Sequence, residues 1–251
     1  CLGDYARALE QFERVVRLQP NDDHAFFSIA LIQRRTAKWP EALESFRRAV
    51  EIEPTASYNW RQFGGMLLLG RRFDEAASAY RRLVELPQNA LGGSFQLATI
   101  PFLARGSKRE MEAYLSGLSP DAGLPDRRTW AVWIGDSAEM MRLDRLQPRP
   151  SAEMMAVVYA AAGDTAGARA RLENASTGLR SRLEREPDNA TLWGRLGRME
   201  AILGNKDEAR RCARKAVELV PASVDSLDGP KHAADLAFVY AWTGDKDRAI
   251  A

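Results

Sequence analysis

The stretch EALESFRRAVEIEPTASYNWRQFGG, Glu41–Gly65, carries the pattern that decides the fold. Ala42, Phe46 and Pro54 each stand 34 positions after an identical residue, and the alanine returns 34 positions later at Ala76. A fixed spacing of this size indicates an array of repeated supersecondary units. We therefore interpret the chain as a repeat protein.

Each repeat is predicted to be two antiparallel helices joined by a tight corner. A glycine suits the left-handed end of the first helix, and the Asp or Asn that follows it suits the cap of the second helix. A proline then stops the second helix and turns the chain into the next pair. Corners of this kind begin at Gly3, Gly135, Gly163, Gly204 and Gly244, whereas Gly70 stands one place early.

Small residues on the first helices are expected to let the two helices of a pair approach closely. We expect Ala30, Gly64, Ala156, Gly197 and Ala237 to face Ala42, Ala76, Ala168, Ala209 and Ala249 in the partner helices. Because one pair cannot bury its apolar face alone, stability should come from stacking neighbouring pairs.

The words WRQFG, from Trp60, and WGRLG, from Trp193, together with the periodic alanines, aromatics and prolines, resemble the tetratricopeptide repeat (TPR) family. That family has a 34-residue pattern of W-x2-L-G-x2-Y, then A-x3-F, then P. The resemblance implies an all-α fold: an α-solenoid, a right-handed superhelix of antiparallel TPR helix pairs of bacterial type. It is close over residues 1–88 and 150–251 and weak over about 90–149.

The repeats suggest three segments. Residues 1–88 are interpreted as regular TPR units, the first one partial, and 89–149 as diverged helix pairs with a linker. Residues 150–251 are interpreted as TPR-like units with a long, projecting helix at about 165–186 and a truncated last unit. Both ends lie inside repeats, so we expect a piece of a longer array.

The diverged middle has two notable features. Pro101 interrupts a helical pattern where the family carries an apolar residue, and SGLSPDAGLPD, residues 116–126, is the best linker candidate. Turn-forming residues of this kind favour a loop.

Composition narrows the function classes. The chain has 251 residues, 45% of them hydrophobic, and a formal net charge of +2. This balance gives no signal for a polyanion partner. No apolar run approaches the roughly 20 residues of a membrane helix, and no secretory signal precedes the first helical pattern. We therefore expect no membrane partner and a cytoplasmic location.

Residues that could carry chemistry are scarce. The 2 cysteines, Cys1 and Cys212, cannot form a disulfide framework, and His24 and His232 have no clustered ligands around them. There is no P-loop, nucleophile elbow or zinc-protease motif. We expect neither a metal, nor a cofactor, nor a catalytic residue, and hence not an enzyme.

A basic stripe lies on one predicted helix. It contains Arg210, Arg211, Arg214 and Lys215. Acidic neighbours are interleaved, which favours a solvated, ion-paired face over nucleic-acid binding.

In TPR proteins the first helices line a concave groove that receives a peptide or a partner's helix. By this resemblance the binding positions are His24, Phe27, Leu31, Tyr58, Arg61, Arg198, Phe238 and Trp242. Phe238 and Trp242 are four apart and share a helical face. They are either an exposed anchor or residues that a following repeat would cover.

The leading hypothesis is a non-catalytic scaffold for a protein or peptide partner. Some TPR domains clamp a chaperone's terminal carboxylate with basic and Asn residues, but Phe27, Leu31 and Gln62 occupy those positions, so we expect no such clamp. The alternative is a regulatory or sensory segment of a larger signalling protein, such as a kinase, nucleotide cyclase or winged-helix regulator. The closing words LAFVYAWTGDKDRAI, from Leu236, resemble the last repeats of such regions.

Overall fold

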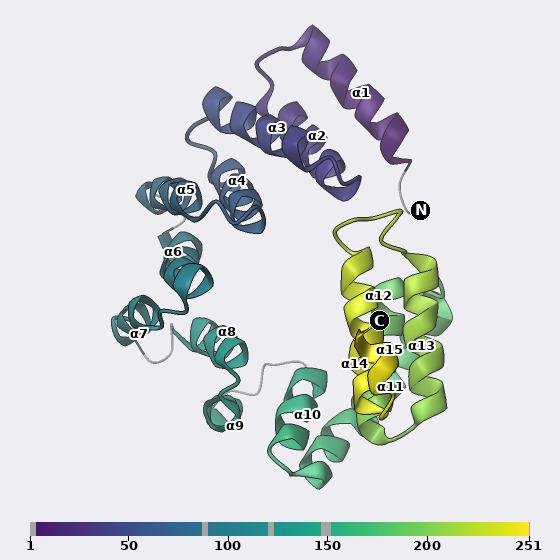
Figure 1. Cartoon of the computed structure of the whole chain (residues 1–251). Helices are drawn as coiled ribbons and strands as arrows, with labels where there is room; N and C mark the ends of the chain where they lie inside the picture. The colour runs from purple at the N-terminus through teal and green to yellow at the C-terminus, as the bar shows by residue number, and fades with distance from the viewer. Residues whose placement is uncertain (1–3, 87–89, 120–122, 147–151, 251) are drawn as a thin grey trace. The chain divides into compact units, whose positions relative to one another are not determined.

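The computed structural model describes residues 4–86, 90–119, 123–146 and 152–250 (Figure 1), and these segments contain helices and turns without a strand. The chain divides into two compact units, Cys1–Asp126 and Arg127–Ala251. The expected segments 1–88, 89–149 and 150–251 rest on the repeat pattern and stay a prediction.

The first compact unit stacks three helix pairs after a single helix (Figure 1). Its helices are α1 (Tyr5–Leu18), α2 (Asp23–Arg35), α3 (Trp39–Ile52), α4 (Ser57–Leu69), α5 (Phe73–Glu85), α6 (Ala90–Arg105) and α7 (Arg109–Ser116). One core cluster joins Ala30, Ala42, Phe46 and Met66, which come from α2, α3 and α4. Because each cluster draws on consecutive pairs, the pairs stabilise one another.

The second compact unit repeats this arrangement, and the boundary between the units falls in the first turn of α8. The helices are α8 (Leu124–Ile134), α9 (Ser137–Leu146), α10 (Ala152–Ala161), α11 (Thr165–Arg185), α12 (Ala190–Leu203), α13 (Lys206–Leu219), α14 (Gly229–Trp242) and α15 (Lys246–Ile250). The linker expected at 116–126 covers the turn between α7 and α8, of which 120–122 lie outside the described residues.

The long helix does not project as expected. Its final turns carry Leu179 and Leu183, which are buried in one cluster with Leu192 of α12. The added length of α11 therefore packs against the next pair, because an apolar stripe continues to its end.

The corners follow the expected chemistry with two corrections. Gly163, Gly204 and Gly244 have φ between 83 and 89°, in the left-handed region. In the third repeat, however, Arg71 (φ 56°) takes this conformation, and Gly70 stays right-handed. Asn205 does not cap α13 through its side chain. Its side-chain Nδ2 instead donates a hydrogen bond to Glu200 Oε2 at 2.7 Å.

The small residues permit close packing, but for different reasons. A Cβ at Gly197 would lie 3.0 Å from the backbone oxygen of Ala209 and the backbone nitrogen of Ala213, so α12 and α13 meet backbone to backbone. A Cβ at Gly64 would lie 2.9 Å from the ring of Tyr80. Gly64 therefore makes room for an aromatic ring. Its nearest neighbour in the partner helix is Tyr80 and not the expected Ala76.

Candidate partner-binding faces

Three aromatic side chains meet on the first helices of the first compact unit. His24 of α2 stacks on Tyr58 of α4 with ring centroids 5.2 Å apart and an interplanar angle of 16°. Phe27 meets Tyr58 edge-on at 5.1 Å and Phe46 at 5.8 Å. His24 is exposed, while Phe27 and Tyr58 are half-buried. We call His24, Phe27 and Tyr58 the aromatic cluster.

Asp23 holds this cluster in place. The Tyr58 hydroxyl donates a hydrogen bond to Asp23 Oδ2, and Asn59 Nδ2 donates to the same oxygen at 2.9 Å. Burial acts to raise the pKa of Asp23, but the hydrogen bonds from Tyr58 and Asn59 outweigh it, so the pKa lies below its usual value. Burial and the Asp23 acceptor raise the pKa of Tyr58. An ionised carboxylate thus fixes a protonated phenol at neutral pH.

The sequence prediction did not include Asp23, because an acid at a helix start is explained by the helix dipole alone. The available signal was its spacing: Asp23 and Tyr58 are 35 positions apart, which is close to one repeat. Two residues one repeat apart lie on neighbouring first helices.

Leu31 and Arg61, the other two predicted residues of this unit, have packing neighbours of their own. Leu31 is half-buried against the core cluster of Ala30 and Phe46. Arg61 is exposed, and its Nη1 lies only 2.9 Å from where a Cβ at Gly92 would stand. Its guanidinium therefore lies on the backbone of α6.

In the second compact unit, Arg198 joins two first helices. It forms an ion pair with Asp235 of α14, and the two side chains are 29% and 15% exposed. A Cβ at Gly194 would lie 2.6 Å from Asp235 Oδ2, so the missing side chain makes room for the pair. Asp235 was not predicted, and the salt bridge makes Arg198 an interhelical contact, while its place in a binding groove stays a prediction.

Phe238 and Trp242 stack on each other on α14, with ring centroids 5.3 Å apart and an interplanar angle of 27°. Phe238 is half-buried against the cluster that contains Ala213 and Val239. Trp242 remains 39% exposed. Within the described residues, Phe238 therefore belongs partly to the core, and Trp242 presents its ring to solvent.

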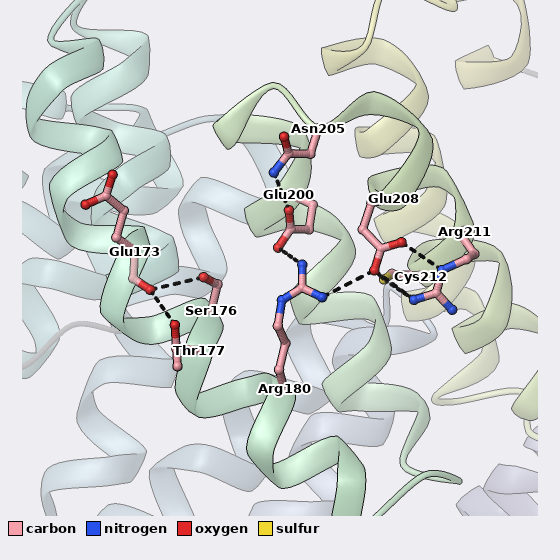
Figure 2. Close-up of polar contacts among 9 residues, drawn as sticks. All are labelled: Glu173, Ser176, Thr177, Arg180, Glu200, Asn205, Glu208, Arg211 and Cys212. Carbon is pink, nitrogen blue, oxygen red and sulfur yellow. Dashed lines mark hydrogen bonds and ion pairs between the residues drawn. The ribbon is translucent and has the colours of Figure 1, made fainter.

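A polar network ties α11, α12 and α13 together (Figure 2). Glu200, whose side chain is 2% exposed, accepts hydrogen bonds from Arg180 Nη2 and Asn205 Nδ2, both at 2.7 Å. Arg180 Nη1 also reaches Glu208 Oε1 at 3.4 Å. Arg211 bonds both oxygens of Glu208, at 2.7 and 2.8 Å.

The electrostatics of this network suit a structural role. Hydrogen bonds from Arg211 hold the pKa of Glu208 at about 2. Burial raises the pKa of the Cys212 thiol to about 12. A permanently ionised acid and a protonated thiol lack the properties of a general acid or a nucleophile.

The described residues offer neither a metal site nor a membrane-spanning helix. No group of three or more His, Cys, Asp or Glu side chains among them is placed to hold a metal ion. Across those residues, every helix is too short or too polar to cross a bilayer.

Stacked antiparallel pairs, left-handed corners and aromatic side chains on the first helices define an all-α repeat protein of the solenoid class. A sequence model of the tetratricopeptide repeat family matches residues 2–57 and 153–224, just over half of the chain. The chain therefore belongs to the tetratricopeptide repeat family. No curated protein matches its sequence.

Solved structures agree on the fold. A tetratricopeptide repeat protein from Parabacteroides merdae is 17% identical, with 94% of this chain and 93% of that chain covered and a TM-score of 0.57. Tom70 from yeast is 13% identical over 97% of this chain, with a TM-score of 0.52. The match spans 59% of the Tom70 chain.

Proposed function

We propose that this chain is a non-catalytic protein-interaction scaffold that binds a peptide or a partner's helix across its first helices. The aromatic cluster carries this proposal. It places an exposed imidazole on a tyrosine ring whose orientation is held by Asp23. Membership of a repeat family that serves as interaction scaffolds supports it.

The physical basis is preorganisation. Aromatic side chains dominate interface energetics when they are well packed. A ring already held by a hydrogen bond loses little conformational entropy on binding. Phe238 and Trp242 form a comparable stacked pair in the second compact unit. We propose each group as an anchor within its own unit.

The proposal does not include a chaperone carboxylate clamp, nucleic acid or membrane partner. Gln62, at a clamp position, accepts a hydrogen bond from Arg34 Nη1 at 3.0 Å. Two residues of the basic stripe on α13 have neighbours as partners: Arg211 pairs with Glu208 at 2.7 Å, and Arg214 donates to the hydroxyl of Tyr240 at 3.2 Å. The ion pair with Glu208 offsets the charge of Arg211, which lowers the attraction of the stripe for phosphate groups.

The test is selection of peptides from a displayed library by the intact chain, followed by affinity measurements. Trp242→Ala or Tyr58→Ala should weaken the selected peptides by about tenfold or more, as expected for an aromatic anchor. Trp133→Ala is the matched control, since Trp133 is 42% exposed and lies on α8, outside the proposed positions. If all three variants bind the selected peptides as tightly as the parent chain does, Tyr58 and Trp242 are excluded as anchors.

The ion pair calls for a separate control. Charge reversal of Arg198 alone would place two acids together at Asp235. The exchanged variant Arg198→Asp/Asp235→Arg restores the pair, so a loss of binding that this exchange rescues reports helix packing and not partner contact.

A further inference from the structure

Carboxylates gather around the aromatic cluster. Asp22 caps α2 through its side chain, and Asp23 accepts the hydrogen bond from Tyr58. Glu53 is the C-terminal cap of α3, close enough to Tyr58 for its charge to act on the phenol. We call Asp22, Asp23 and Glu53 the acidic edge. Within the described part of the chain, none of its carboxylates forms an ion pair with a Lys or Arg side chain.

The helix ends at the acidic edge do not offset its negative charge. α1 ends at Leu18 and α2 begins at Asp23, while α3 ends at Ile52 and α4 begins at Ser57. In both places a C-terminal end with a partial negative charge meets an N-terminal end with a partial positive charge. These opposed partial charges cancel to a first approximation, so the formal charges of the three carboxylates remain.

The predicted binding residue with a positive charge nearest to Tyr58 in the sequence points elsewhere. Arg61 stands about one turn after Tyr58 on α4, but its guanidinium lies on the backbone of α6 at Gly92. Burial, the hydrogen bond to Asp23 and the charges of Asp23 and Glu53 all raise the pKa of Tyr58, and the charge of Arg61 has no part in this shift. The phenol is therefore surrounded by negative charge.

Hydrogen-bond acceptors outnumber donors at the same place. Tyr58 and Asn59 Nδ2 both use their donors on Asp23 Oδ2. Asn59 is fully buried, and its Oδ1 has no hydrogen-bond partner among the described residues. Asp22 and Glu53 each accept a backbone N–H with one carboxylate oxygen, which leaves the second oxygen of each for another donor. A partner that fits this edge therefore brings N–H groups and a positive charge.

His24 provides a stacking surface beside these acceptors. Its side chain is exposed, and Tyr58 is the one ring that contacts it within the residues that the structure describes. A guanidinium group is planar, stacks on aromatic faces and has five N–H donors and no acceptor. An ammonium group carries the same charge but has no plane to stack. The combination of a ring with unpaired carboxylates thus favours arginine over lysine.

We propose that the aromatic cluster binds an arginine of a basic partner peptide, with the guanidinium on the open face of His24 and its charge opposite the acidic edge. This inference rests on the proposed scaffold function and deepens it, because it names the chemistry of the peptide that the first compact unit binds.

The experiment uses peptides that the intact chain selects from a displayed library and that lose affinity for Tyr58→Ala. We expect these peptides to share an arginine at a fixed position. Exchange of this arginine for citrulline keeps the planar shape and removes the charge, and it should weaken binding by about tenfold. Lysine in its place should restore part of the affinity, because it restores the charge without the stacking. Fluorescence anisotropy at about 0.15 M salt measures all three peptides, since distant exposed charges are screened there.

A double variant tests the acidic edge. Asp22→Asn/Glu53→Gln removes two charges and keeps an oxygen for each backbone N–H that Asp22 and Glu53 accept. Asn is as good an N-cap as Asp, so the fold should persist, and circular dichroism checks this. The arginine and citrulline peptides should then differ by about threefold or less. Glu10→Gln/Glu13→Gln is the matched control, since it changes the net charge equally at exposed positions of α1, and it should keep the tenfold preference.

The outcomes separate this inference from the scaffold function. Peptides that depend on Tyr58 but carry no arginine, or that bind equally well with citrulline, would overturn the basic occupant and leave the scaffold proposal standing. A double variant with the full arginine preference would overturn the role of the acidic edge, and a lysine peptide that binds as tightly as the arginine peptide would overturn the stacking on His24. If no peptide is selected, or if none depends on Tyr58, both the inference and the proposed anchor fail.

Discussion

Removing the Arg180 guanidinium is the most direct test of the network that joins α11, α12 and α13. In Arg180→Met, the Glu200 carboxylate, 2% exposed, keeps the Asn205 amide as its remaining partner in the network. Breaking a fully buried pair costs about 3–5 kcal/mol. Because Arg180 is itself 48% exposed, solvent screening reduces this to about 2 kcal/mol. For a chain of this size, the melting temperature should fall by roughly 4–8 °C.

The assay is a thermal melt followed by circular dichroism, combined with hydrogen exchange of α12. The cycle includes Glu200→Gln and the double variant. Once the acid is neutral, Arg180→Met should cost about 0.5 kcal/mol or less. Arg182→Met is the control, because Arg182 and Glu186 are 3.5 Å apart and nearly half exposed. A loss for Arg180→Met that is no larger than this control, or that is unchanged by Glu200→Gln, would refute the reasoning.

Three further expectations concern packing and protonation. Gly197→Val should destabilise the chain by about 1–3 kcal/mol, because a Cβ at position 197 lies 3.0 Å from the backbone of α13. Gly178→Ala is the control, since a Cβ there has no atom within 4 Å, and it should be neutral or stabilising. Denaturant titrations measure both changes. Because Arg211 holds the pKa of Glu208 at about 2, below its ordinary 4.5, the unfolded state binds the proton first. The stability from Glu208 should be complete above about pH 5 and disappear toward pH 2, and Arg211→Met should flatten that part of the acid-melting curve. The Cys1→Ser variant leaves Cys212 as its one cysteine. This buried thiol, with its pKa of about 12, should react with a thiol reagent only after denaturation.

Much of the fold is predictable from local chemistry. The 34-residue spacing predicts helix pairs, and glycines at the corners predict the left-handed turns found at Gly163, Gly204 and Gly244. These features depend on the backbone preferences of single residues, so they can be predicted without knowing what packs around them.

The corrections have a common origin in tertiary packing. Arg71 takes a left-handed conformation that an arginine disfavours. The adjacent Gly70, which would tolerate it, stays right-handed. The backbone N–H of Arg72 donates to the carbonyl of Leu67 at 2.9 Å, so the hydrogen-bonded end of α4 is kept, and it outweighs this local preference. Pro101 does not end α6, since a helix held between α5 and α7 persists without one backbone hydrogen bond.

The candidate site divides in the same way. Repeat register places Tyr58 and Trp242 on first helices, and this much follows from spacing. The hydrogen bond from Tyr58 to Asp23 and the pairing of Arg198 with Asp235 join different helix pairs. Such contacts depend on how neighbouring pairs stack, which no single repeat specifies.

The sequence by itself determined the repeat, its helix pairs, its corners and the face on which the predicted binding residues stand. Only the tertiary structure decided which of those residues are held by neighbours and where cavities remain between pairs. The physical reason is that helix and turn formation follow from short-range backbone preferences, whereas partnering and burial arise when separate pairs pack together.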